Sequence, residues 1–519
     1  MKTELDGANT FFEMEVCVMK GKKKPAPMHP ERVLQFGDGV FLRGFVDWML
    51  HHMNEQGLFR GQAVVVQPFA EGSADEINEQ NGMYTLLHRG ICDGRTVDEA
   101  ELIGSIRRAI NPYSDYKAFL HCALNPDLRF IVSDTSPEGI VFTEDDHFTD
   151  FPPSSFPAKL TVFLYKRFKT YHGKASKTFV ILPCEQIDRN GDVLKQTVLR
   201  YARKWHLEQE FVWWIGHNEF VNTVADRLVT GYPQDEIKEL THRIGYVDHL
   251  INTAEPFHQW IIETANPRLP AELPLAQAGL NAVWTNQLTP YHTRKVRILD
   301  GMQTILTLTA FLCGKQTMKQ GMDDSLLAAF VHKVLSEEII PSLDPELAAS
   351  EATKAYADLV PERLANPLLQ RQLHRLVNHA VAQFRRSVLP SLLEFRKRHQ
   401  YPPALLCFSL AALILLYKGT ALDNERLAAR RATEVFIVEE ETDHVATFRD
   451  FWSAYEGTPA SACQLVSRVL KHEPFWGMSL ANTDGLAAQI STSLVLMINK
   501  GIPEALWLAL QGKPAIAEA

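Results

Sequence analysis

The stretch RVLQF (32–36), GDG (37–39), FLRGFVDWMLHHMNEQ (41–56) and AVVV (63–66) decides the fold of the N-terminal half. Residues 32–36 and 63–66 are short apolar runs, which is typical of buried strands, whereas residues 41–56 carry apolar side chains at helical spacing. Gly57 suits the end of that helix. A strand, a glycine turn, a helix and a second strand within about 35 residues predict a βαβ unit.

Two further apolar runs, residues 129–133 and 178–183, extend this pattern, and helical stretches lie between them. Unbroken apolar strands separated by helices favour a parallel sheet that is covered on both faces. The N-terminal half is therefore predicted to be an α/β domain.

Helical patterns dominate after about residue 290, and no strand alternation is evident there. The expected helices cover residues 295–313, 325–340, 367–384, 404–417, 461–470 and 486–499, and prolines separate several of them. A domain boundary is expected within residues 279–291, between the α/β domain and a mostly helical one.

The composition sets limits on the class of protein. A chain of 519 residues exceeds what one hydrophobic core usually holds, and a formal charge of -9 argues against a protein that coats nucleic acid. The seven cysteines lack the spacing of a zinc site and suggest reduced thiols in the cytoplasm. The sequence shows no secretion signal, and its longest apolar run, residues 404–416, is too short to span a membrane.

The glycine turn is a candidate phosphate site. Gly37 and Gly39 would let backbone N–H groups approach a pyrophosphate at a helix N-terminus, and Arg43 could add a phosphate contact. Glu71, shortly after the second strand, is a candidate for holding the adenosine ribose. The alternatives are an ordinary strand–helix turn and a surface loop acid.

The segment KVRILDGMQT (295–304) is a candidate catalytic helix. At about 100° per residue, Lys295, Asp300 and Gln303 fall on one arc of roughly 140°. A lysine in a low-dielectric cleft has a lowered pKa and can transfer a proton near neutral pH. The alternative is a surface lysine with an acidic neighbour.

These segments resemble the long-chain polyol-specific dehydrogenase family that includes mannitol dehydrogenase, and within it the altronate oxidoreductase (tagaturonate reductase) branch. The likeness runs from about residue 30 and is carried by PERVLQFGDGVFLRGFVDW (30–48), VVVQP (64–68), NPDLRFIVSDTS (125–136), ILPCEQIDRNGD (181–192), NTVADRLVTGYP (222–233), TPYHTRKVRILDG (289–301), EEIIPSLD (337–344) and FSLAALILLY (408–417).

Residues 1–29, which carry acids and a lysine cluster, are expected to be a poorly ordered extension. The resemblance implies a Rossmann-type domain over 30–289 and a helical substrate and catalytic domain over 290–519, with the active site between these two domains. It further implies NAD as cofactor, no metal, a small sugar acid or polyol as substrate, and Lys295 as general acid/base. The cofactor residues expected on this basis are Gly37, Asp38, Gly39, Val40, Phe41, Arg43, Glu71 and Asp134. Those expected near the substrate are Glu185, Asn190, Asn222, Asp226 and His379. Arg294, Arg297 and Arg375 are candidates for the substrate carboxylate, because a planar guanidinium matches a carboxylate with two parallel hydrogen bonds.

The sequence departs from the family pattern around the expected site. At the positions of Asp300 and Gln303, the family pattern has Asn and His. Asp134 and His379 also differ from the residues that similar proteins carry at these positions. An ionised Asp300 cannot donate a hydrogen bond to a developing alkoxide, but it favours the ammonium form of Lys295, which suits ketone reduction.

Three hypotheses follow for the function. The first is an NAD-dependent oxidoreductase that interconverts a sugar acid and its keto form. The second is a sugar-acid isomerase or epimerase with tightly bound NAD, and the third is a catalytically impaired homologue that only binds the sugar acid.

Overall fold

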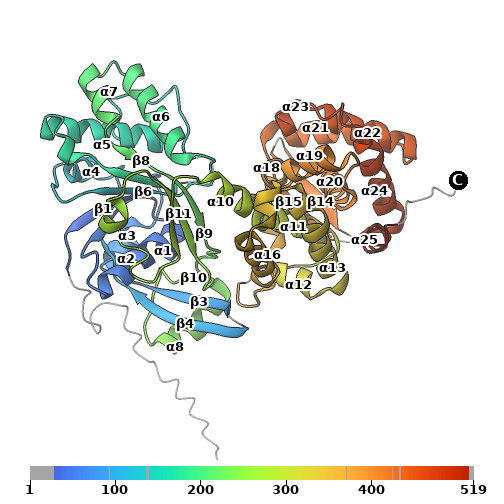
Figure 1. Ribbon diagram of the computed structural model, residues 1–519, viewed down its shortest axis with the longest axis horizontal. Helices are drawn as coiled ribbons and strands as arrows, with labels where there is room; N and C mark the ends of the chain where they lie inside the picture. The colour runs from blue at the N-terminus through green and yellow to red at the C-terminus, as the bar shows by residue number, and fades with distance from the viewer. Residues whose placement is uncertain are drawn as a thin grey trace, which may run out of the picture. The chain divides into compact units, whose positions relative to one another are not determined.

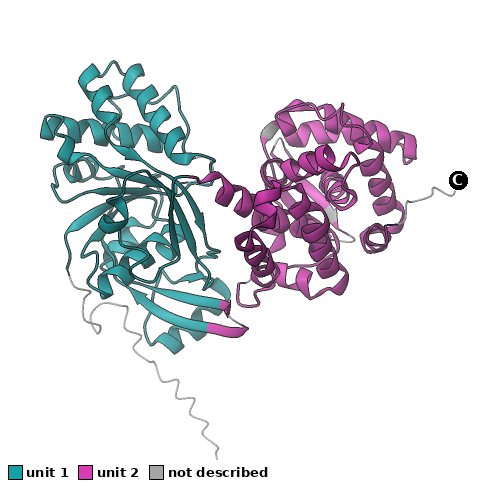
Figure 2. Cartoon of the chain, viewed as in Figure 1, with its two compact units in different colours: residues 1–89, 98–286 teal, residues 90–97, 287–519 magenta. Residues whose placement is uncertain are grey.

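The computed structural model describes residues 28–92, 94–135, 139–369, 371–423, 425–431 and 434–512. The chain divides into two compact units, residues 1–89 with 98–286 and residues 90–97 with 287–519 (Figure 2). The expected N-terminal extension lies outside the described residues, except for its last two. No helix in the described ranges has both the length and the apolar character needed to cross a membrane.

A six-stranded sheet forms the centre of the first unit (Figure 1). Its strands, in spatial order, are β5 (Ile106–Ile110), β2 (Gln62–Val66), β1 (Glu31–Phe36), β6 (Phe130–Ser133), β7 (Val180–Pro183) and β8 (Glu219–Phe220). All neighbouring strands are parallel. This is the 3-2-1-4-5-6 order of the doubly wound dinucleotide-binding fold, so the predicted α/β class is confirmed.

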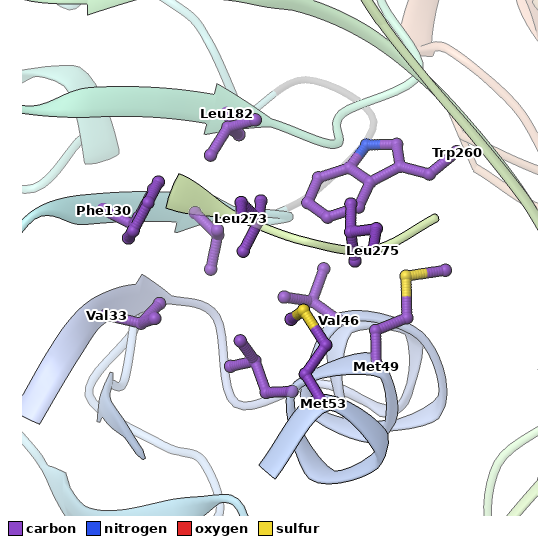
Figure 3. Close-up of a pocket in the computed structure, with 11 residues that line it drawn as sticks. Val33, Val46, Met49, Met53, Phe130, Leu182, Trp260, Leu273 and Leu275 are labelled. Atoms are coloured by element: carbon purple, nitrogen blue, oxygen red, sulfur yellow. The ribbon is translucent and has the colours of Figure 1, made fainter. Parts of the chain in front are cut away.

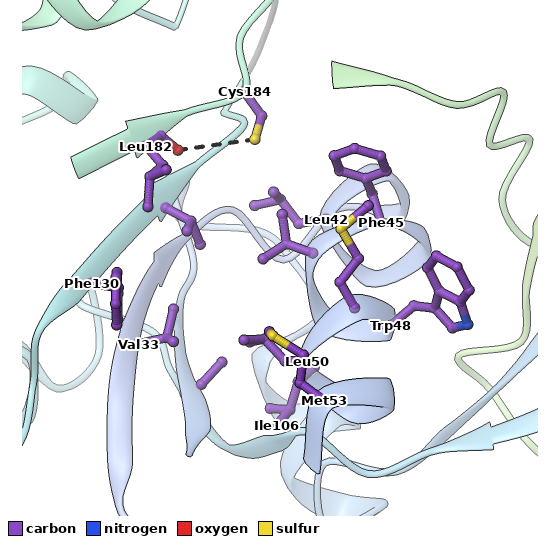
Figure 4. Close-up of a cluster of buried hydrophobic side chains, with 14 of the residues drawn as sticks. Val33, Leu42, Phe45, Trp48, Leu50, Met53, Ile106, Phe130, Leu182 and Cys184 are labelled. Atoms are coloured by element: carbon purple, nitrogen blue, oxygen red, sulfur yellow. Dashed lines mark hydrogen bonds between the residues drawn. The ribbon is translucent and has the colours of Figure 1, made fainter. Parts of the chain in front are cut away.

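Alternating side chains of the strands supply two separate cores. On β1, Val33 points into a cluster with α1 (Val40–Gly44) and α2 (Val46–Glu55), whereas Leu34 points into a cluster with α5 (Phe156–Tyr171) and α6 (Asn190–Lys204). Figure 4 shows the first cluster, which includes Leu42, Phe45 and Met53 of the helical segment and Val33, Phe130 and Leu182 of the strands. Burial on both faces explains why these strands read as unbroken apolar runs.

Two smaller sheets, which the sequence did not indicate, complete the first unit. One consists of β10 (Asn252–Ala254), β3 (Tyr84–Cys92) and β4 (Arg95–Ile103), and the other of β12 (Ala282–Thr285), β11 (Gln259–Glu263) and β9 (Asn222–Asp226). In β4 only Ile103 is buried, and most of the other residues face solvent. Such a strand lacks the apolar run on which the prediction relied.

The second unit is mostly helical, as expected. Its apolar run forms α20 (Ala404–Leu416), which is buried on almost every side and packs against α11 (Gly301–Leu312) and α24 (Leu486–Lys500). A helix that is apolar all round belongs in a core, and the interpretation of this run as a buried helix is confirmed.

Two local expectations for the second unit were wrong. A three-stranded antiparallel sheet, β13 (Gly419–Ala421), β14 (Arg426–Arg431) and β15 (Glu434–Glu439), occurs where no strand was expected. The single helix expected over residues 367–384 is instead α17 (Leu373–Leu376) and α18 (Ala380–Ser387). His379 separates them with a φ of 53°, a left-handed conformation that ends an α-helical path.

Candidate functional site

The glycine loop lies between the end of β1 and the start of α1. Gly37 has a φ of 123°, and a Cβ atom there would lie 2.5 Å from the carbonyl oxygen of Asp134 at the end of β6. A Cβ atom on Gly39 would meet nothing within 4 Å, and no side chain caps the helix that follows. The loop is therefore held close to β6 at Gly37 and open at Gly39, which suits an anion at the helix N-terminus.

The loop after β2 is tied to the glycine loop. The Asp38 carboxylate accepts a hydrogen bond from the backbone N–H of Ser73 at 2.5 Å. Gln67 orders the same loop, because its Oε1 accepts from the N–H of Ala74 at 3.1 Å. Glu71 lies exposed between these anchors, in the loop that follows β2.

Arg43 does not face outward from the loop. Its guanidinium is buried and donates to the backbone carbonyls of Asp38 at 3.3 Å and Leu250 at 2.7 Å. The Arg43 guanidinium therefore stabilises the loop from inside the protein and is not positioned for the expected phosphate contact. Of the other loop residues, Val40 is exposed and Phe41 is partly buried.

Two carboxyl groups lie at the ends of neighbouring strands β6 and β7. Glu185 is buried and accepts from the hydroxyls of Ser133 at 2.9 Å and Thr135 at 3.2 Å. Burial and, secondarily, the charge of Asp134 raise the pKa of Glu185 to about 7, and burial raises the pKa of Asp134 to about 6. At neutral pH, Glu185 is therefore partly protonated and able to donate a hydrogen bond.

This shift predicts a pH dependence of stability. The pKa of Glu185 lies above its ordinary value of 4.5, so the folded chain binds more protons than the unfolded chain and loses stability as the pH rises from 4.5 to 7. We expect the Glu185→Gln protein not to show this loss. Its free energy of unfolding relative to that of the wild type should therefore rise by on the order of 2 kcal/mol between pH 5 and pH 8. Urea unfolding at pH 5 and pH 8 measures these free energies. Equal changes with pH in the two proteins would contradict the prediction.

Asn190 and Asn222, expected near the substrate, are used by the fold. The Asn190 amide donates to the carbonyls of Pro183, Glu185 and Thr223, and its Oδ1 accepts from the N–H groups of Gly191 and Thr223. Asn222 accepts from the N–H of Asp192, near the start of α6, and donates to the Asp192 and Glu263 carboxylates. Asp226 is buried at the end of β9.

We expect Asn190→Ala to lower the free energy of unfolding by about 2–5 kcal/mol, because buried partners of the amide would lose their hydrogen bonds. Chemical denaturation measures the change. An unchanged stability together with a raised KM would instead assign Asn190 to the substrate.

In the second unit, Lys295 begins a π-helical segment, η3 (Lys295–Asp300), which joins α10 (Thr289–Arg294) to α11. Hydrogen bonds in a π-helix run between residues five apart, which brings residues i and i+5 onto one face. Lys295 Nζ donates to Asp300 Oδ2 at 3.0 Å, and the two side chains are 11% and 12% exposed. The structure thus brings these two expected site residues together.

A third charged residue joins this pair. Nη2 of Arg386, on α18, lies 3.5 Å from the same Asp300 Oδ2 atom. Gly301 permits the close approach of α18, because a Cβ atom there would lie 3.1 Å from the carbonyl oxygen of Ser387. A hydrogen bond of 3.1 Å between the hydroxyls of Thr304 and Ser387 fixes the contact.

The remaining expected residues of the second unit lie around this cluster or away from it. Gln303 is half-buried on α11. Arg375 is exposed on α17, and His379 is exposed at the start of α18, about 10 Å along that helix from Arg386. Among the described residues, neither contacts Lys295 or Asp300.

A small cavity lies inside the first unit between the sheet and α2 (Figure 3). Val33, Phe130 and Leu182 of the strands and Met49 and Met53 of α2 contribute to its apolar lining. Its volume of about 10 Å³ is at the lower limit for one water molecule. It is a packing defect of the core and has no room for a substrate.

One group within the described ranges has the spacing of metal ligands. The ligand atoms of Glu440, Glu441 and His444 lie within 4.8 Å of one another. The Glu440 carboxylate, however, already accepts hydrogen bonds from the N–H of Val381, in α18, and from the Tyr417 hydroxyl. These contacts give Glu440 a structural role at the start of α18.

Two family models match most of the chain. The mannitol dehydrogenase Rossmann domain matches residues 31–273, and the mannitol dehydrogenase C-terminal domain matches residues 287–498. The chain is 38% identical over 479 residues to an altronate oxidoreductase of Halalkalibacterium halodurans, covering 92% of this chain and 93% of that protein. It is 40% identical over 481 residues to an altronate oxidoreductase of Pectobacterium carotovorum, covering 92% and 96%.

Solved structures agree on the fold. The ternary complex of Pseudomonas fluorescens mannitol 2-dehydrogenase with NAD and D-mannitol superposes with a TM-score of 0.74 at 19% identity, covering 94% of this chain and 95% of that chain. A substrate-free D-sorbitol dehydrogenase gives a TM-score of 0.70 at 19% identity, covering 92% and 95%. Because both domain models match in order and relatives at about 40% identity span nearly the whole length, this chain belongs to the mannitol dehydrogenase family.

Proposed function

We propose that the protein is an NAD-dependent oxidoreductase that interconverts a sugar acid and its keto form, with D-altronate and D-tagaturonate as the pair to test first. The observation that carries this is the 38–40% identity to altronate oxidoreductases over 92% of the chain. Lys295, a buried amine held by a carboxylate in a chain that also has a dinucleotide-binding sheet, fits the same reaction.

The residues of the glycine loop fit a dinucleotide. The space beside Gly39 is open, and the backbone N–H groups at the start of the following helix would bind a pyrophosphate there. Glu71, exposed in the loop after β2, would accept hydrogen bonds from the ribose hydroxyls. When bound, NAD supplies the hydride acceptor, and NADH supplies the hydride.

Lys295 moves the proton of the reaction. In the reducing direction its ammonium donates a proton to the carbonyl oxygen, and in the oxidising direction its amine accepts one. Asp300 orients Nζ by the 3.0 Å hydrogen bond. Because the Asp300 carboxylate cannot donate to a developing alkoxide, the neutral donor left nearby on this helix is the Gln303 amide.

The substrate is a small molecule, and a panel of keto sugars tests which one. We expect NADH absorbance to fall with tagaturonate, and fructuronate and fructose show how far the specificity extends. The same assay with NADPH tests the role of Glu71. No cofactor oxidation with any keto acid would refute the proposal, and sugar conversion without net change in NADH would support the isomerase alternative.

A further inference from the structure

Two exposed aromatic side chains lie in loops at the carboxyl ends of β2 and β5, which are neighbouring parallel strands. Phe69, in the loop after β2, is 54% exposed, and Tyr113, in the loop after β5, is 38% exposed. Among the residues that the structure describes, neither ring stacks on another aromatic ring. Both rings therefore leave apolar surface in water at one end of the sheet.

Hydrogen bonds hold the two loops together on either side of Phe69. Asn111 Nδ2 donates to the carbonyl oxygen of Ala70 at 3.2 Å, and the Tyr113 hydroxyl donates to the carbonyl oxygen of Pro68 at 3.3 Å. The two acceptors are the residues before and after Phe69 in the chain. The backbone that carries Phe69 is therefore fixed against the loop that carries Tyr113, while the Phe69 side chain stays exposed.

A buried lysine holds the Tyr113 ring from inside the protein. Lys159 Nζ, on α5, donates to the Tyr113 hydroxyl at 3.1 Å and to the carbonyl oxygen of Ser154 at 2.6 Å, and it lies 5.1 Å from the centroid of the Tyr113 ring. The ring is thus ordered before any ligand is present. Because an ordered group loses little conformational freedom on binding, such a ring is suited to form the wall of a binding site.

The position of both rings in the sheet corresponds to the adenosine half of a dinucleotide. In the 3-2-1-4-5-6 strand order, one mononucleotide-binding half consists of β1, β2 and β5, and the glycine loop after β1 is the candidate pyrophosphate site. Glu71, the candidate for the adenosine ribose, is two residues beyond Phe69 in the same loop. A purine attached to that ribose has two π faces that stack on aromatic side chains.

We propose that Phe69 stacks on the adenine ring of the bound dinucleotide and that Tyr113 forms a second aromatic wall of the same subsite. This inference rests on the proposed function, because it takes NAD as the cofactor. Stacking removes from water the apolar surface that Phe69 exposes in the free protein. The subsite does not touch the reacting carbon, so it acts on the affinity for the cofactor and not on hydride transfer.

The test measures the binding of ADP-ribose, which has the adenosine and the pyrophosphate of NAD but no nicotinamide, by calorimetry. Phe69→Ala removes the ring, and Phe69→Tyr keeps it. Trp213→Ala is the matched control, because Trp213 is a 64% exposed aromatic residue of the same unit. It lies on α7 (Gln209–Ile215), which precedes β8 at the opposite edge of the sheet from β5. Circular dichroism and the unfolding midpoint establish that each variant is folded.

We expect Phe69→Ala to weaken ADP-ribose binding and to raise the KM for NADH by about 5- to 100-fold, with kcat at saturating NADH changed less than about threefold. Phe69→Tyr and Trp213→Ala should bind ADP-ribose within about twofold of the wild type. Wild-type binding by Phe69→Ala, or an equal loss in Phe69→Tyr, would overturn the inference.

A tryptophan at position 69 reports on stacking directly. In Phe69→Trp, ADP-ribose should quench the indole emission more than it does in the wild type, because the added indole would lie against the purine. A purely structural role of Phe69 gives no such signal. Quenching no greater than that of the wild type would therefore also contradict the stacking.

ADP-ribose binding separates this inference from the proposed function. If the wild type binds ADP-ribose through Phe69 but reduces no keto acid, the proposed reaction fails while the adenine subsite stands. If tagaturonate is reduced and Phe69→Ala keeps the wild-type KM for NADH, the reaction stands and the adenine subsite is wrong.

Discussion

Replacing Lys295 with methionine is expected to lower kcat for tagaturonate reduction by about 10²–10⁴-fold, the usual contribution of a positioned general acid. Methionine keeps much of the volume of the lysine side chain but has no proton to donate. NADH binding, measured by fluorescence titration, should remain within about twofold of the wild type, because the glycine loop belongs to a different unit of the chain.

Two controls make the Lys295→Met result interpretable. Circular dichroism and the unfolding midpoint establish that the variant is folded, and Lys315→Met, a lysine of the same unit that pairs with Asp324, should retain full activity. A Lys295→Met protein with more than about a tenth of the wild-type kcat would exclude Lys295 as the proton donor.

Gly37→Ala is expected to have the second large effect, on both cofactor binding and stability. The φ of 123° is unfavourable for any residue with a Cβ atom, and the new methyl group would lie 2.5 Å from the Asp134 carbonyl oxygen. Strain of this kind costs about 1–3 kcal/mol, and the displaced loop should bind NADH at least about tenfold more weakly. Denaturant unfolding and fluorescence titration measure the two effects.

Gly39→Ala is the matched control for Gly37→Ala. Its φ of -68° is ordinary, and the added methyl group meets no atom within 4 Å. We expect its unfolding free energy to stay within about 1 kcal/mol of the wild type, while the methyl group takes space that the pyrophosphate needs. Equal destabilisation by the two substitutions would show that the conformation of Gly37 is not what constrains the loop.

Four of the six strands of the central sheet were predictable because they share one sequence pattern, whereas β5 and β8 were not expected. Strands β1, β2, β6 and β7 are buried on both faces, so each is an apolar run that can be recognised from its local sequence alone. β15 also carries an apolar run, VFIV (435–438), although Val435 and Ile437 are exposed and Val438 is buried. This run was a strand signal of the same kind, and the expectation of a helical half left it unused.

The site was only partly predictable, because the roles of polar residues depend on distant partners. Asn190 and an asparagine that binds substrate have the same side chain, and only the carbonyls around Asn190 tell them apart. Arg386 was missed because its contact with Asp300 joins residues 86 positions apart along the chain. The signal available was Gly301, where a glycine within a long helical pattern indicates the close approach of another segment.

The π-helical turn is what lets Lys295 and Asp300 meet, because five residues of an ordinary α-helix would set the two side chains about 140° apart. Deleting one residue between 295 and 300 would let the helix close its ordinary i to i+4 hydrogen bonds, so the backbone would not oppose the change. The lysine and the aspartate would then lie four residues and about 40° apart, which keeps them on one face of the helix. A shorter helix with an ordinary turn is therefore expected to preserve the ion pair, whereas straightening the turn without a deletion would break it.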